Sequence, residues 1–318
     1  MKRPVLLIDG LNLFMRHFVV NPTIDDSGNH VGGVVGFLKS LGYLVTRVNP
    51  SRVIIAWEGG GSARRRAIYK DYKNNRRPQK LNRYYGDQIP DTVENRNSQI
   101  SKIVSILRSV PVDQIYIDDC EADDIIGYIV KNKIQERSVI ASSDKDLYQL
   151  LSKKTIQWSP GQKKFITKKD LIDKFGISAT NFCTARSFIG DSSDGVDGVK
   201  LAGFRSLSKR FPELSEDAFF SVQDVFDSCK KIEDKKKLKL HNNIIESIDL
   251  AKRNWKLMYL DITNLSAEQI KKIDFSLENK CKSANKMQLL KSISKLGIKN
   301  FDIDSFYSNM IIVRKNNV

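Results

Sequence analysis

Four short apolar segments of this 318-residue chain each lead into acidic residues. They cover residues 5–9, 52–57, 114–118 and 138–143, and each is typical of a strand buried on both faces of a parallel sheet. Helical patterns lie between them, at about residues 34–48, 97–110 and 122–133. This alternation predicts an open α/β sheet, in which ligands lie beyond the carboxyl ends of the strands.

Carboxylates follow all four predicted strands at that edge. They are Asp9, Glu58, Glu121, Asp123, Asp124, Asp144 and Asp146. Carboxylates that converge repel one another and raise one another's pKa unless cations neutralise them. Hard divalent cations bind such oxygen ligands, so the pattern predicts a metal site. The alternative for each acid taken singly is a helix cap or a solvated charge in a first helical turn.

A basic segment follows the second predicted strand, in a chain of formal net charge +16. Against Asp71 alone, residues 64–83 place nine cations, which are Arg64, Arg65, Arg66, Lys70, Lys73, Arg76, Arg77, Lys80 and Arg83. Tyr69 and Tyr72 are interleaved with them. Cations track phosphates and aromatic rings stack on bases, so the segment predicts contact with a single-stranded nucleic acid. The alternative is a solvated, mobile loop.

Other classes of site are disfavoured. Three histidines leave little scope for histidine chemistry, and four scattered cysteines without a C-x-x-C pair argue against zinc and disulfides. Neither a G-x-G-x-x-G nor a G-x-x-x-x-G-K-[ST] motif follows a predicted strand. No apolar run approaches the roughly 20 residues of a membrane helix. We therefore expect a soluble, cytoplasmic monomer without a membrane partner.

Five motifs, taken in order, resemble the 5′ nuclease superfamily, which has a PIN-like fold. They are "LLIDGLN", "YKNNR", "EADD", "SSDKDLYQLL" and "FIGDSSDGVDGV". The superfamily includes flap endonucleases and the exonuclease domain of bacterial DNA polymerase I. "IQWSP" and "YKDYKNNR" are similar to its bacteriophage ribonuclease H type. The resemblance covers about residues 5–203 and implies a nuclease domain over residues 1–185, with a basic arch at about 62–96, and a helical duplex-binding region over 186–318.

The resemblance also implies two Mg²⁺ sites, at which Mn²⁺ would substitute. Asp9, Glu58, Glu121 and Asp123 would surround one ion, and Asp124, Asp144, Asp146, Asp191 and Asp194 the other. Family members usually carry Asp where Glu58 stands. The longer Glu side chain still reaches a metal ion or its water shell, so we expect activity to persist.

Contacts to the nucleic acid follow from the same resemblance. Lys73 and Arg76 match catalytic arch residues that contact the scissile phosphate, and Tyr72 matches an aromatic that stacks on the terminal base. Further nucleic-acid contacts are expected from Arg64, Arg65, Arg66, Lys70 and Arg77. Residues 195–211 match a helix-hairpin-helix-like element, in which Gly198 and Gly203 would approach a duplex phosphate. Leu201 replaces a common glycine there, which weakens the case for a K⁺ ion.

The resulting hypothesis is a divalent-metal-dependent, structure-specific 5′→3′ exonuclease or flap endonuclease. It would remove RNA primers or 5′ flaps from duplex DNA or an RNA/DNA hybrid during phage-type replication, in contact with a single-strand-binding protein and a sliding clamp. One alternative is a PIN-type ribonuclease acting on single-stranded RNA, although such domains usually end before a hairpin element. The other is a catalytically inactive nucleic-acid-binding protein, although every expected acidic position remains acidic.

Overall fold

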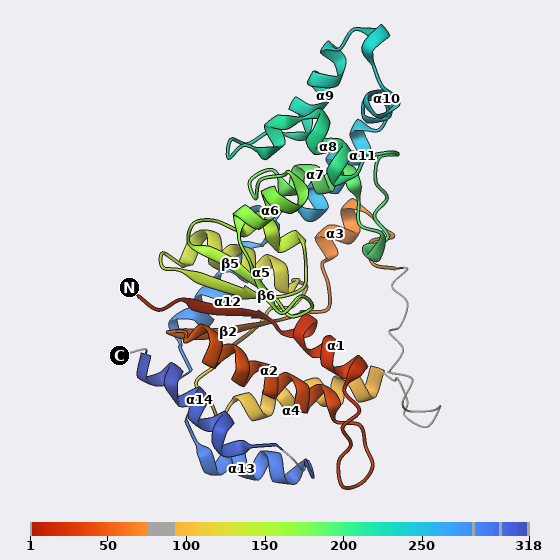
Figure 1. The fold of residues 1–318 in the computed structure, drawn as a ribbon. Coiled ribbons are helices and arrows are strands. Elements are labelled where there is room, and N and C mark those ends of the chain that lie inside the picture. Colours follow the sequence, from red (N-terminus) through yellow and green to blue (C-terminus); the bar gives the residue numbers. More distant parts are fainter. Residues whose placement is uncertain (1, 75–92, 282–283, 299–300, 317–318) are drawn as a thin grey trace.

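A six-stranded sheet forms the centre of the computed structural model, which describes residues 2–74, 93–281, 284–298 and 301–316 (Figure 1). The strand order is β3-β2-β1-β4-β5-β6. The strands are β1 (Val5–Asp9), β2 (Arg52–Trp57), β3 (Asp113–Tyr116), β4 (Ser138–Ala141), β5 (Thr155–Ser159) and β6 (Lys164–Ile166). β1 to β5 pair in parallel, and β6 pairs antiparallel to β5. The predicted open, mostly parallel sheet is confirmed, with two further strands at one edge.

Helices cover both faces of the sheet, and apolar residues of the central strands point to both of these faces. Leu6 and Ile8 of β1 belong to one core, and Val5 and Leu7 to the other. The first core is completed by α1 (Gly10–Val20), α2 (Gly32–Val48), α4 (Val93–Leu107), α13 (Lys286–Lys295) and α14 (Ile303–Asn316). The second is completed by α5 (Ala122–Tyr128) and α12 (Ala267–Glu278).

The parallel register brings the carboxyl ends of the central strands to one edge. Asp9 at the end of β1 pairs with Ala56 of β2, and Ile8 pairs with Ala141 of β4. Asp9 is also the N-cap of α1, where its carboxylate accepts a hydrogen bond of 3.0 Å from the backbone N–H of Asn12. The acids that follow these strands are therefore gathered at one end of the sheet.

A helical region with its own core lies beyond the end of the sheet at which these acids gather (Figure 1). Phe182, Phe188 and Leu207 are fully buried in it. Its helices are α6 (Lys168–Phe175), α7 (Phe182–Ile189), α8 (Phe204–Arg210), α9 (Val222–Lys231), α10 (Lys239–Glu246) and α11 (Ile248–Met258). Short 3₁₀ turns lie at Asp146–Leu150, Ser192–Asp194, Pro212–Ser215, Asp234–Lys236 and Ile262–Asn264, and a π turn at Ile129–Lys133.

The end of the described chain packs against the sheet. Two helices, α13 and α14, form this part of the chain. Phe306, Met310 and Val313 recur at helical spacing along α14 and are buried in the core that α2 shares with the sheet. The chain therefore returns to the cores beside the sheet after α11. None of the helices in the described ranges is long and apolar enough to cross a membrane.

Candidate metal and nucleic-acid site

Two acids at the ends of β1 and β2 are held in a partly desolvated environment. Asp9 is 8% exposed, and burial raises the pKa of its carboxyl to about 6. Glu58 is half-buried, and burial raises its pKa to about 7, although Lys73 acts in the opposite direction. A carboxyl group with a raised pKa is one whose negative charge the surroundings do not yet compensate. The two side chains therefore favour the approach of a cation.

The acids after β4 repeat this pattern. Burial, followed by the charge of Asp146, raises the pKa of Asp144 well above its usual range. Burial also raises the pKa of Asp146, although Arg186 lowers it. The Asp144 carboxylate accepts a hydrogen bond of 2.8 Å from the backbone N–H of Asp146, so the two acids of "SSDKD" share one tight turn. Gln157 of β5 holds this turn by donating to the carbonyl of Asp144 at 2.8 Å.

Asp191 and Asp194 lie on the turn after α7, with Arg186 beside them. Arg186 donates to Asp146 at 3.0 Å and also to Asp191, so it joins two acids that are far apart in the sequence. Burial alone would raise the pKa of Asp191, but Arg186 and Ser193 hold that pKa below its usual value. Arg186 was not identified from the sequence as a residue of the site. A lone arginine within the otherwise mostly apolar helix "FCTARSFI" was the available signal.

Lys73 connects the basic segment to both groups of acids. Its Nζ lies 2.6 Å from Glu121 Oε2 and 3.9 Å from Glu58 Oε1. Its backbone N–H donates to the carbonyl of Asp194 at 2.9 Å, and its backbone lies in the left-handed region, with φ of 62°. The structure thus places the predicted catalytic lysine directly at the carboxylates. Arg76 and Arg77 lie outside the described residues.

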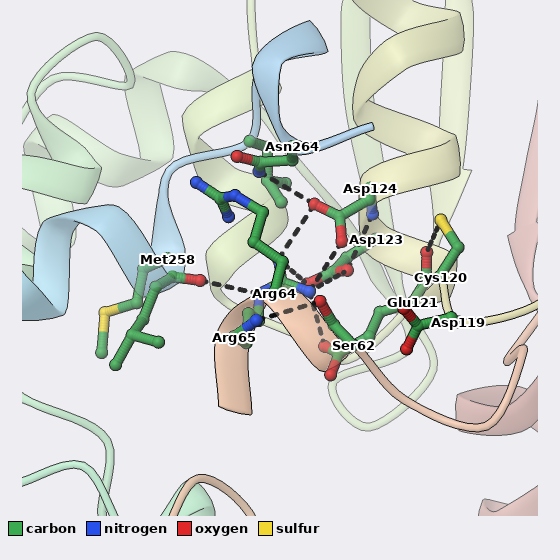
Figure 2. Close-up of polar contacts among 12 residues, drawn as sticks. Ser62, Arg64, Arg65, Asp119, Cys120, Glu121, Asp123, Asp124, Met258 and Asn264 are labelled. Atoms are coloured by element: carbon green, nitrogen blue, oxygen red, sulfur yellow. Dashed lines mark hydrogen bonds and ion pairs between the residues drawn. The ribbon is translucent and has the colours of Figure 1, made fainter. Parts of the chain in front are cut away.

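Arg65 is buried, whereas the sequence predicted a contact with nucleic acid. It lies on α3 (Ala63–Ile68) and is 1% exposed. Its guanidinium faces Asp124, Asp123 and Glu121 (Figure 2). Ser62 caps α3 by accepting a hydrogen bond of 3.2 Å from the Arg65 N–H, which fixes the start of the helix. Arg65 is therefore an internal cation of the acidic cluster.

Tyr72 is also turned inward, whereas the resemblance implied stacking on a base. It is 7% exposed, and its hydroxyl donates to Glu121 Oε2 at 3.2 Å. It packs in a small apolar cluster with Leu257 and Met258 of α11.

The remaining described cations of the segment differ from Arg65. Arg64 is half-buried, and Arg66 and Lys70 are exposed, so these three are available to a phosphate backbone.

The triple glycine of "WEGGGS" explains how α3 reaches the acids. A Cβ on Gly59 would lie 1.7 Å from the carbonyl oxygen of Ile117, and Gly60 and Gly61 have φ values of 89° and 94°. The Gly59 N–H donates to the carbonyl of Cys120 at 2.9 Å, next to Glu121. A close backbone approach followed by two left-handed residues requires glycine. The link therefore carries the chain from β2 back across the acidic edge.

The donor set of the cluster fits hard divalent ions. The acidic side chains of the cluster offer only carboxylate oxygens, which hard divalent ions prefer. One of these oxygens, Glu121 Oε1, is buried without a hydrogen-bond partner. Such an orphaned acceptor is costly unless a cation or donor reaches it. In the described part of the chain, no three acids, histidines or cysteines already enclose a single metal position. Arg65, Lys73 and Arg186 supply the positive charge inside the cluster in this structure.

The predicted hairpin lies immediately after these acids. A Cβ on Gly198 would lie 1.9 Å from the carbonyl oxygen of Ile189, so only glycine fits there. Gly203 is the N-cap of α8. Leu201 has φ of 70° and is 56% exposed, so this leucine adopts the left-handed backbone that glycine favours. The turn between Gly198 and Gly203 therefore keeps a conformation suited to glycine although its sequence departs from the family pattern.

Asn264 is a second residue of the cluster that the sequence did not indicate. Its Nδ2 donates to Asp124 Oδ1 at 2.9 Å (Figure 2). It reaches α5 from a 3₁₀ turn 140 residues further along the chain. No local pattern marks such a residue, because its role depends on how the chain returns to the sheet.

Acids from several parallel strand ends, with basic residues from the next connection among them, define a carboxylate-based nuclease centre on a PIN-like fold. Residues 4–176 match the model of the family described as 5′-3′ exonuclease, N-terminal resolvase-like domain. The chain belongs to this family. It is a 5′ nuclease, and hence a phosphodiesterase, of the exonuclease and flap endonuclease type.

Relatives and solved structures agree with this assignment. The chain is 25% identical over 301 residues to a 5′-3′ exonuclease of Aquifex aeolicus, covering 92% of this chain and 96% of the relative. It is 27% identical over 257 residues to the flap endonuclease Xni of Shewanella woodyi, covering 80% and 92%. The fold is similar to that of a bacteriophage T5 flap endonuclease solved with DNA and metal ions, with a TM-score of 0.63, 18% identity and coverage of 98% and 100%.

Proposed function

We propose that this 5′ nuclease uses two Mg²⁺ ions, for which Mn²⁺ substitutes, to cut a strand near its 5′ end. The observation that carries the proposal is the convergence of Asp9, Glu58, Glu121 and Asp144 at one sheet edge with Lys73 beside Glu121. Asp9, Glu58, Glu121 and Asp123 would hold one ion, and Asp144, Asp146, Asp191 and Asp194 the other. Bound ions would lower the pKa of a water molecule and offset the charge that develops in an in-line displacement.

The basic segment would act on the scissile phosphate. Lys73 stands at the carboxylates and would stabilise the negative charge that builds up on the phosphate oxygens. The exposed Arg66 and Lys70 on the same segment would anchor the phosphates of the 5′ single strand. Arg76, which lies outside the described residues, remains a proposed second catalytic cation.

The substrate would be duplex DNA or an RNA/DNA hybrid with a 5′ single-stranded end. The turn between Gly198 and Gly203 would offer backbone N–H groups to a duplex phosphate. Leu201, which stands where such hairpins commonly have a glycine, argues against a K⁺ ion at this turn. The cellular role would be removal of RNA primers or 5′ flaps during phage-type replication, with contact to a single-strand-binding protein and a sliding clamp.

Product sizing tests the proposal. A 5′-labelled flap duplex and the matching single strand would each be incubated with Mg²⁺ and with chelator. We expect Mg²⁺-dependent release of short 5′ products from the duplex and little cleavage of the free strand. Cleavage confined to the single strand would favour a PIN-type ribonuclease. Binding to the duplex without cleavage would contradict the nuclease proposal.

A further inference from the structure

We infer that Asp124 is not a metal ligand but the fixed partner of Arg65, and that this buried pair positions the base of the basic segment against the carboxylate centre. The inference deepens the proposed function and rests on it, because it decides which carboxylates are left to bind the ions. Family resemblance alone placed Asp124 among the ligands of the second ion.

Both oxygens of Asp124 are occupied by protein donors. Oδ2 accepts from Arg65 Nη1 at 2.7 Å, and Oδ1 accepts from Arg65 Nη2 at 3.0 Å. Oδ1 also accepts from Asn264 Nδ2 at 2.9 Å (Figure 2). A bidentate pair between a guanidinium and a carboxylate is the strongest geometry that these two groups adopt. A divalent ion at Asp124 would have to displace a donor from either oxygen, whereas Glu121, which also contacts Arg65, keeps Oε1 without a hydrogen-bond partner.

Asp123, the neighbouring residue on α5, makes the contrast. One helical step turns its side chain by roughly 100° from that of Asp124. The Asp123 side chain is 16% exposed and that of Asp124 is 4% exposed. The contacts between Asp123 and Arg65 are longer, at 3.4 and 3.5 Å. Asp123 therefore keeps access to the open side of the centre, whereas Asp124 faces the interior.

Arg65 also joins three separate parts of the chain. Besides the acids of α5, its Nε donates to the carbonyl of Leu257 on α11 at 2.8 Å. Ser62 fixes the start of α3, and the chain continues from the end of α3 to Lys73. A buried arginine stays charged, so it stabilises this junction only while a buried acid forms an ion pair with it. The pair would thereby hold Lys73 near Glu121 whether or not metal ions are bound.

Counting bound metal ions tests the assignment directly. Protein-bound Mn²⁺ would be counted by electron paramagnetic resonance in the wild type, in Asp124→Asn and in the matched control Asp123→Asn. We expect Asp124→Asn to bind as many ions as the wild type, with affinity lowered by about ten- to a hundredfold, as for a residue that supports ligands without being one. We expect Asp123→Asn to bind fewer ions. Loss of an ion in folded Asp124→Asn would overturn the inference.

Two further variants separate positioning from simple stability. In case Asp124→Asn fails to fold, the double variant Arg65→Gln/Asp124→Asn removes both buried charges together. It should bind the wild-type number of Mn²⁺ ions, and a folded double variant that has lost an ion would also overturn the inference. Arg65→Lys cannot form the bidentate pair. It should lower kcat about tenfold or more while leaving the Mn²⁺ count and the KM for a flap duplex near wild type. An unchanged kcat would contradict the positioning role.

Measurements on the wild type distinguish a failure of the proposed function from a failure of the inference about Asp124. If wild-type protein binds no Mn²⁺ and cuts no flap duplex, the proposed metal-dependent function fails. If it does both and Asp124→Asn alone loses an ion, the function stands and the inference about Asp124 fails.

Discussion

The ammonium of Lys73 lies 2.6 Å from Glu121 Oε2, while the backbone N–H of the same lysine donates to the carbonyl of Asp194 at 2.9 Å. One residue of the basic segment thus contacts the acids that follow β3 and those that follow α7. Its left-handed backbone, with φ of 62°, is held by these contacts on both sides. The arrangement couples the position of this ammonium to the geometry of the carboxylates.

Lys73→Ala is expected to slow single-turnover cleavage of a flap duplex by roughly 10²- to 10³-fold, the loss typical of a group that stabilises transition-state charge. Affinity for the duplex in chelator should change only a few-fold. Lys70→Ala provides the contrast, because Lys70 is exposed on the same segment and is proposed only to anchor a phosphate, so this change should lower affinity and leave the single-turnover rate near wild type. A loss in Lys73→Ala that appears only in affinity would reduce Lys73 to a phosphate anchor.

The stability of the metal-free protein should fall as the pH rises from about 5 to about 7.5. Burial raises the folded-state pKa of Asp9 to about 6 and that of Glu58 to about 7, from ordinary values of 3.8 and 4.5. In this window the folded state holds protons that the unfolded state has released, so deprotonation favours unfolding. Thermal unfolding in chelator should show a lower Tm at pH 7.5, and added Mg²⁺ should raise Tm more at pH 7.5 than at pH 5.

Glu58→Gln provides the control for that pH dependence. The amide has the shape of the protonated acid and does not ionise, so the fall in Tm between pH 5 and 7.5 should be smaller than in the wild type. A wild-type Tm that rises over this range in chelator, or an equal fall in Glu58→Gln, would contradict the assignment of the raised pKa to Glu58.

Leu201→Gly is expected to be more stable than Leu201→Ala by about 1 kcal/mol, because only glycine adopts the left-handed backbone without a penalty. The φ of 70° at Leu201 motivates the comparison, and its 56% exposure means that either change removes few contacts. Urea unfolding of the two variants measures the difference. An alanine variant at least as stable as the glycine variant would show that the turn relaxes away from this conformation.

The fold was largely predictable because its strands are continuous apolar runs that end in acids. Asp9 and Glu58 could be placed together from parallel order alone. The sequence did not reveal α14, whose apolar residues are spaced among polar ones, or β5 and β6, the last two strands on one side of the sheet. These elements depend on the rest of the sheet for their burial.

The site was harder to predict in its cations than in its acids. Among many basic residues in one segment, composition does not show that Arg65 turns inward while Arg66 stays exposed. That choice follows from the Ser62 cap and from the glycine link that carries α3 back to the acids. Tyr72 was likewise expected at a base, and its burial against α11 depends on a contact between distant parts of the chain.

Cleavage by Asp144→Asn is the sharpest test of the proposed metal centre, because burial and the charge of Asp146 raise the pKa of Asp144 and this acid makes no ion pair among the described residues. The measurement is product release from a 5′-labelled flap duplex in Mg²⁺, with duplex binding in chelator measured on the same protein. If Asp144 is a metal ligand, cleavage is abolished in Asp144→Asn and duplex binding is largely retained. Cleavage at the wild-type rate by Asp144→Asn would contradict the assignment of these carboxylates as the metal centre of the nuclease.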